Sequence, residues 1–127
     1  MRIHFIIIAT WFFSFVISQR RLNEDLKTTI FKDFNELRKS ESLAPIQFWW
    51  DYLENLAILS FTENGYESGF GEKIKEDTFR FQDEAINPFA LKTHLKNGAK
   101  LENVYLNNII AVGCAKNQVY VTCVYLK

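Results

Sequence analysis

The C-terminal end of the chain predicts a β-hairpin that holds both of its cysteines. Two β-rich runs, Ile109–Ala115 and Val119–Leu126, flank a short polar link. Runs of this kind on either side of a polar turn are typical of paired antiparallel strands. Each run carries one cysteine, Cys114 and Cys123, and the 127-residue chain has no others. The pairing of these two strands therefore constrains the fold more than any other segment does.

The amino terminus indicates export from the cell. A short positive start precedes an apolar run from Phe5 to Ile17. That run is shorter than the ~20 residues a membrane-spanning helix needs. We expect residues 1–18 to be a secretory signal peptide cut after Ser18, with an uncleaved anchor as the alternative, and residues 19–127 to form one domain. Arg20-Arg21 follow directly, and the sequence leaves open whether they form a dibasic processing site.

Two cysteines in an exported chain most simply form one disulfide, here between Cys114 and Cys123. The bridge requires a hairpin register that places both side chains on the same face of the sheet. Two free buried thiols are the alternative. In the chain-entropy model, closing so short a loop stabilises the fold by about 2–3 kcal/mol.

Composition excludes several classes of function. The 15 Lys and Arg side chains balance the 15 Asp and Glu side chains, and no basic stripe points to a nucleic acid or an anionic membrane as partner. No second apolar run is long enough to span a bilayer, so we expect no membrane span after signal cleavage. The sequence also lacks a Gly-x-Ser-x-Gly motif, a Gly-rich phosphate loop and a Cys-x-x-Cys pair.

Apolar side chains recur every three or four positions at the start of the expected mature chain, which predicts an amphipathic helix ending near Ser40. These positions are Leu22, Leu26, Ile30, Phe34 and Leu37. A second helix should begin near Trp50, and the Asn64-Gly65 pair should stop it, because both residues tolerate a left-handed backbone.

The rest of the chain gives weaker signals. A third helix is expected from about Glu76 to Ile86, and Leu101–Leu106 fits either a strand or a short helix. Trp49 and Trp50 are adjacent and cannot share one helix face, so we expect one of them in the core. The other either packs within a loop or lies exposed, where it would suit a partner. Helices followed by strands indicate an α+β fold with helices covering an antiparallel sheet.

Several segments occur in the order and spacing of a known secreted family. They are Phe34-Asn35-Glu36-Leu37-Arg38, Ala44-Pro45-Ile46, Trp50-Asp51 with Leu53, Leu56 and Ala57, Gly71-Glu72-Lys73-Ile74, Arg80–Glu84 and Gly98–Tyr105. Together with the closing hairpin, they resemble the CAP superfamily, which contains cysteine-rich secretory proteins, antigen 5 and pathogenesis-related protein 1. The resemblance implies an α-β-α sandwich in which helices flank a small antiparallel sheet.

The family's central cleft commonly holds two His and two Glu, and in some members the histidines bind a divalent metal. The resemblance places Glu72 and Glu84 at the glutamate positions. The histidine positions fall near residues 61–64 and on Ala99, and neither holds a histidine. His94, the one histidine of the expected mature chain, is the remaining cleft candidate. Zinc sites favour imidazole ligands, so the resemblance implies no bound metal or cofactor here.

Three hypotheses follow. The leading one is a secreted, non-catalytic CAP-like domain that acts by binding an extracellular protein or a lipid. The second is a divalent-metal-dependent enzyme that uses Glu72, Glu84 and His94. The third is a decayed family member without activity.

Overall fold

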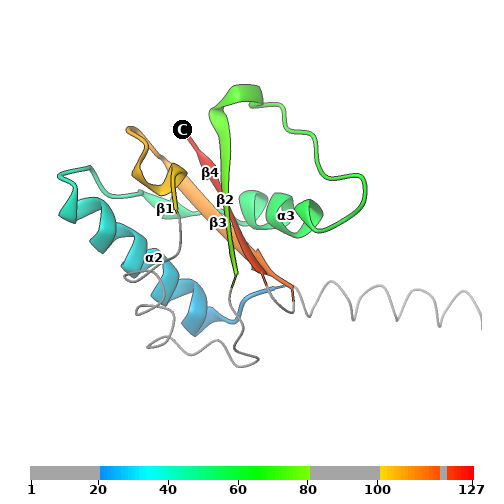
Figure 1. Cartoon of the computed structure of the whole chain (residues 1–127), viewed down its shortest axis with the longest axis horizontal. Helices are drawn as coiled ribbons and strands as arrows, with labels where there is room; N and C mark the ends of the chain where they lie inside the picture. The colour runs from blue at the N-terminus through cyan, green and yellow to red at the C-terminus, as the bar shows by residue number, and fades with distance from the viewer. Residues whose placement is uncertain (1–20, 81–100, 118–119) are drawn as a thin grey trace, which may run out of the picture.

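The computed structural model describes residues 21–80, 101–117 and 120–127, and in these ranges two α-helices enclose a four-stranded sheet (Figure 1). The elements in chain order are α2 (Glu24–Ser40), β1 (Phe48–Trp49), α3 (Asp51–Ser60), the 3₁₀ turn η1 (Gly71–Lys73), β2 (Ile74–Arg80), the 3₁₀ turn η2 (Asn103–Tyr105), β3 (Ala111–Lys116) and β4 (Tyr120–Leu126). No helix within these ranges is long and apolar enough to cross a bilayer.

The sheet has the strand order β1-β3-β4-β2. β3 and β4 form the expected C-terminal hairpin, and β2 pairs antiparallel with β4 along its whole length. β1 adds a short parallel pairing to β3, through Phe48 opposite Ala111 and Trp49 opposite Val112. The antiparallel sheet predicted from the sequence therefore forms the centre, with one two-residue parallel strand at its edge.

Each helix covers a different face of the sheet, because successive side chains of a strand point to opposite faces. The α2 face carries Val112, Cys114, Val121, Cys123 and Tyr125, which pack with Leu26, Ile30 and Phe34 of the helix. The α3 face carries Ala111, Ala115, Val124 and Leu126, which pack with Leu53, Leu56, Ala57 and Ile58. The layers form an α-β-α sandwich, and the α+β fold class expected from the sequence is confirmed.

The first helix follows its apolar spacing. Leu26, Ile30 and Phe34 are almost fully buried and form one stripe against the sheet. Asn23 caps the helix, since its side-chain oxygen accepts a 2.8 Å hydrogen bond from the Leu26 backbone nitrogen. Acidic residues in the first turn and basic residues in the last complement the helix dipole. The helix ends at Ser40, as predicted.

The predicted third helix is wrong over its described part. Residues 76–80 belong to strand β2, and the remainder of the predicted helix lies outside the described residues. The side chains alternate, as a strand requires: Asp77 and Phe79 are buried on the α2 face, while Thr78 bonds Thr122 at 2.9 Å on the other face. The ambiguous segment 101–106 contains the 3₁₀ turn η2.

The two adjacent tryptophans point to opposite sides of the sheet, because Trp49 ends β1 and Trp50, the N-cap of α3, continues its extended backbone. Trp49 packs against the α2-side core and Trp50 against the α3-side core. Both side chains are half-buried, so neither ring is exposed, and of the two interpretations for the second tryptophan the packed one holds. The alternation of a strand, rather than a helix, separates them.

Candidate functional site

Of the predicted cleft residues, only Glu72 lies within the described structure. Glu72 lies exposed in η1. Glu84 and His94 fall outside the described residues, as does Ala99. Across residues 21–80, 101–117 and 120–127, no three His, Cys, Asp or Glu side chains gather as metal ligands. A zinc site requires three or four such ligands, so the side chains of these ranges do not form one.

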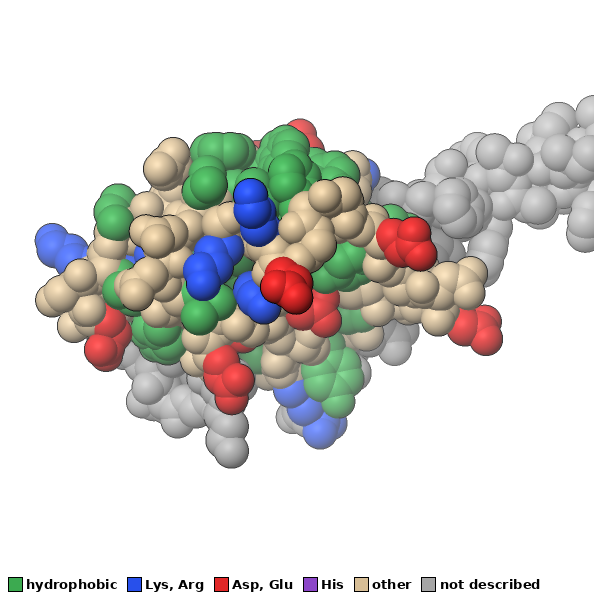
Figure 2. Space-filling view, turned by 90° about the horizontal axis from the view of Figure 1, so that it is seen from above, with side chains coloured by type: hydrophobic (Ala, Val, Ile, Leu, Met, Phe, Trp, Pro, Cys, Tyr) green, Lys and Arg blue, Asp and Glu red, His purple; other side chains and the backbone are tan. Residues whose placement is uncertain are grey.

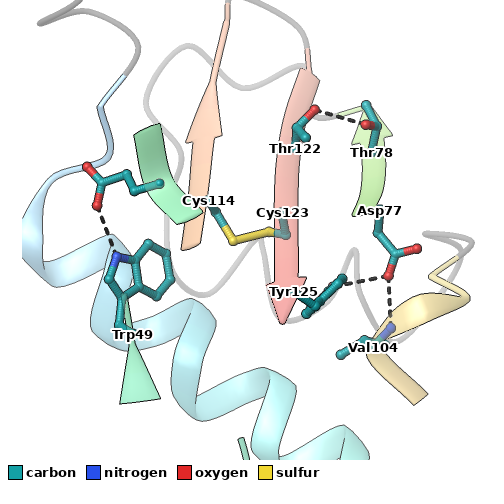
Figure 3. The surroundings of a disulfide bond; sticks show 9 residues. Trp49, Asp77, Thr78, Val104, Cys114, Thr122, Cys123 and Tyr125 are labelled. Carbon is teal, nitrogen blue, oxygen red and sulfur yellow. Dashed lines mark hydrogen bonds between the residues drawn. A yellow bond between two sulfur atoms is a disulfide. The ribbon is translucent and has the colours of Figure 1, made fainter. Parts of the chain in front are cut away.

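The predicted disulfide between Cys114 and Cys123 is present (Figure 3). The two residues are directly opposite in the β3–β4 register, and their Cα atoms lie 4.0 Å apart. Both side chains are fully buried on the α2 face. A disulfide that is closed off by the core on this face serves structure, because exchange chemistry requires access to an attacking thiolate.

A buried carboxylate connects β2 to η2. Asp77 accepts hydrogen bonds from the backbone nitrogens of Glu102, Asn103 and Val104 at 3.0–3.2 Å, and from the Tyr125 hydroxyl at 3.0 Å. Figure 3 shows the bonds from Val104 and Tyr125. Burial, and then the negative charge of Asp77, raise the pKa of Tyr125 well above its ordinary value, so the phenol stays neutral. These bonds commit Asp77 to holding η2 on the sheet.

A second buried carboxylate lies at the edge of the sheet near β1. Glu54 of α3 is fully buried and contacts Arg21 Nη1, Lys27 Nζ and Trp49 Nε1, each at 3.0 Å. Burial lowers the pKa of Lys27, but the hydrogen bond and charge of Glu54 outweigh it and raise that pKa overall. Two cations and an indole N–H thus compensate the buried negative charge.

Arg38 is a third buried charged residue. Its side chain is 1% exposed, and it donates 2.7 Å hydrogen bonds to the carbonyl oxygens of Ala44, Val104 and Leu106. The planar guanidinium presents several N–H groups in fixed directions, which suits three carbonyl acceptors. Arg38 therefore ties α2 to η2 and to the connection before β1.

Four aromatic rings form the clearest candidate contact surface. We name Phe48, Trp50, Tyr52 and Phe70 the aromatic face. Ring centroids lie 4.8 Å apart for Trp50–Tyr52, 5.8 Å for Trp50–Phe70 and 6.0 Å for Tyr52–Phe70. Phe48 lies 6.4 Å from Trp50. Phe48 is 44% exposed and Phe70 is 39% exposed, so two rings are offered to solvent on a base of two half-buried ones.

The aromatic face draws its rings from segments that are distant in sequence. β1 and the start of α3 supply Phe48, Trp50 and Tyr52, and the turn before η1 supplies Phe70. Tyr52 reaches this turn with its hydroxyl, which lies 3.4 Å from Ser68 Oγ. Figure 2, which looks down on the end of the molecule that carries η1, shows hydrophobic side chains gathered along one rim of the surface.

The aromatic face was not predicted from the sequence as a unit. The signal was present in the dense run Phe48-Trp49-Trp50-Asp51-Tyr52, in which alternate positions share a strand face and one residue continues into the helix. Phe70, between Gly69 and Gly71, gives no signal of its own, since an isolated aromatic in a Gly-rich loop does not indicate where it packs.

Comparison with known proteins gives a fold likeness. No protein-family model and no curated protein sequence matches the chain. Among solved structures, the fold is similar to the crystal structure of NaASP2 with Zn²⁺, with a TM-score of 0.55 and 12% sequence identity over 82% of this chain and 80% of that one. At this identity the likeness shows a shared fold, and function has to be argued from the site.

Proposed function

We propose that residues 19–127 form a secreted, non-catalytic CAP-like domain that binds an extracellular protein through the aromatic face. The fold likeness to NaASP2, a CAP-family protein, supports the family resemblance of the motifs. The disulfide and the signal-like amino terminus fit an oxidising, extracellular location.

The exposure of Phe48 and Phe70 carries this proposal. Aromatic side chains supply much of the binding energy at protein interfaces, because a large apolar area is buried for few frozen torsions. The half-buried rings of Trp50 and Tyr52 contact the exposed rings of Phe48 and Phe70 on their protein side. The exposed rings are therefore held in place before a partner binds. Such preorganisation lowers the entropic cost of association.

A protein partner fits this surface better than a lipid. A lipid chain is usually held in a concave cavity that buries most of its surface. Trp50 lies 4.8–6.4 Å from each of the other three rings, and Tyr52 and Phe70 lie 6.0 Å apart, so these contacting rings leave no slot between them. Within the described ranges, an open depression lined by Glu41, Leu43 and Tyr105 carries a carboxylate, which an acyl chain disfavours.

Binding of labelled protein to intact cells tests the proposal. We expect saturable binding that protease treatment of the cells removes, and that Phe48→Ser with Phe70→Ser weakens by about tenfold or more. Tyr120→Ser, which truncates a ring of 43% exposure outside the aromatic face, is the matched control and should bind as the wild type does.

Two outcomes would count against a protein-binding aromatic face. Binding that survives protease treatment and is reproduced by phosphatidylcholine vesicles would assign a lipid ligand instead. Equal weakening by the Tyr120→Ser control would show that the aromatic face is not the contact surface. Urea midpoints of all variants ensure that the comparison is made between folded proteins.

Zinc titration of the purified mature chain tests the non-catalytic part. We expect no sub-micromolar zinc binding, because the histidine positions implied by the family resemblance hold other residues. Sub-micromolar binding that disappears in His94→Ala would favour a metal-dependent enzyme that uses Glu72, Glu84 and His94.

A further inference from the structure

Arg21 is built into the fold on both its backbone and its side chain. Its backbone forms an antiparallel bridge to Ala115 of β3. Because β4 occupies the other edge of β3, Arg21 lies on the edge that β1 also uses. Its guanidinium bonds Glu54 Oε1 at 3.0 Å and Asn55 Oδ1 at 2.9 Å, both on α3.

The next residue anchors the chain just as firmly. Leu22 is 4% exposed and belongs to the core between α2 and the sheet. The peptide bond between Arg21 and Leu22 is thus held on one side by an ion pair and a sheet bridge, and on the other by apolar burial. Proteases bind their substrates as extended segments, so this bond can be cut only when the anchors open.

Glu54 depends on this arrangement. Its carboxylate is fully buried, and among the described residues Arg21 and Lys27 are the cations that contact it. A chain without Arg21 would leave the carboxylate with Lys27 and the Trp49 N–H alone. Removing one partner of a buried charge destabilises a fold more than the pair itself stabilises it.

We propose that Arg21 is an N-terminal latch which sets the limit of trimming of the exported chain. Proteases specific for paired basic residues cut after the second one, which here is the Arg21–Leu22 bond. The latch protects that bond, so Arg20-Arg21 is not a processing site of the folded domain. Trimming that stops before Arg21 leaves the domain intact. A cut after Arg21 removes the bridge to Ala115 at the edge of β3 and leaves the buried Glu54 carboxylate without one of its cations.

The first residue of the secreted protein gives the first test. The full chain is expressed through a secretory host that contains a dibasic-specific protease, and the secreted product is identified by intact mass. We expect the product to begin at or before residue 21. A folded secreted product that begins at Leu22 would overturn the proposal.

Protease challenge of the purified product gives the second test. We expect a dibasic-specific protease to cut the Arg21–Leu22 bond at least about 100-fold more slowly in the native protein than in the unfolded one, because cleavage tracks the open population. Equal rates in the two states would overturn the latch.

Variants of the latch give the third test. We expect Arg21→Gln to lower the melting temperature by about 5 °C or more. Arg21→Lys should fall in between, because one ammonium replaces a fork that bonds both Glu54 and Asn55. Lys32→Gln removes an exposed charge from α2 and should leave melting unchanged. Identical melting of Arg21→Gln and the wild type would contradict the proposal. None of these tests involves partner binding, so they test the N-terminal latch independently of the proposed binding through the aromatic face.

Discussion

Gly113 lies directly against the backbone of Glu54. A β-carbon at position 113 would lie 2.2 Å from the Glu54 nitrogen and 2.7 Å from the Leu53 carbonyl carbon. These are atoms of the α3 backbone, which cannot rotate aside as the end of a flexible side chain can. The helix therefore packs on β3 at a distance that only glycine permits.

Gly113→Ala should consequently destabilise the protein by about 3 kcal/mol, the upper part of the range for overpacked cores. The midpoint of urea unfolding measures the effect. Gly69→Ala is the matched control, since a β-carbon there meets nothing within 4 Å. Equal midpoints for the two variants would show that α3 moves away from the sheet at little cost.

Loss of the disulfide should cost about 2–3 kcal/mol from loop closure in the unfolded chain. We expect the double variant Cys114→Ala/Cys123→Ala to unfold at a lower urea concentration than the oxidised wild type. Reduced wild type should fall to a similar midpoint, whereas the double variant should not respond to reductant. A midpoint that reductant leaves unchanged in the wild type would contradict a stabilising role.

Arg38→Lys should destabilise the protein by about 2–3 kcal/mol despite keeping the charge. A single ammonium cannot reproduce the geometry by which the guanidinium reaches the Ala44, Val104 and Leu106 carbonyls, and a buried carbonyl left without a donor is costly. Arg80→Lys, at the exposed end of β2, is the control. Thermal unfolding of both variants distinguishes the loss of the Arg38 hydrogen bonds from a general effect of replacing arginine by lysine.

Stability should fall at alkaline pH because of Tyr125. Burial and the Asp77 charge raise its folded pKa well above 10.0, whereas in the unfolded chain it ionises near 10. Below pH 10 the phenol keeps its proton in both the folded and the unfolded state, so the contribution of the buried, neutral Tyr125 to stability is fully present. As pH rises from 10 toward the folded pKa, only the unfolded state releases the proton, and the free energy of unfolding falls by up to about 1.4 kcal/mol per pH unit.

Urea unfolding at several pH values measures this slope. Tyr125→Phe should remove part of it, while Tyr120→Phe, which changes an exposed ring, should not. Tyr66 should add to the remaining slope, because burial and a 2.7 Å hydrogen bond to Glu76 also raise its pKa. A slope that is unchanged in Tyr125→Phe would mean that this phenol does not govern alkaline unfolding.

Local signals predicted the parts of the fold whose causes are local. The apolar spacing of α2 gave its end at Ser40, because one face of that helix meets one continuous core. The C-terminal hairpin and its disulfide were predictable for the same reason, since both strands and both cysteines lie within one short segment. The family resemblance added the layer order of the sandwich, which periodicity alone does not contain.

Other features depend on partners far away in sequence. Asp77 lies among polar residues of β2, and its burial depends on the backbone N–H groups of η2 that bind its carboxylate. Glu54 likewise looks like a solvent-facing helix residue until Arg21 and Lys27 are brought to it. Glu72 is exposed in η1, and its role in a cleft stays a prediction, as do the roles of Glu84 and His94.

The position of the short strand β1 along the chain determines which of the two cores each neighbouring indole packs into. Trp49 belongs to the core beside α2, and its neighbour Trp50 belongs to the core beside α3 and to the aromatic face. Deletion or insertion of one residue just before them would turn each indole toward the wrong layer. The length of this connection is therefore as constrained as its composition, and the two indoles offer separate fluorescent reporters for the two halves of the interior.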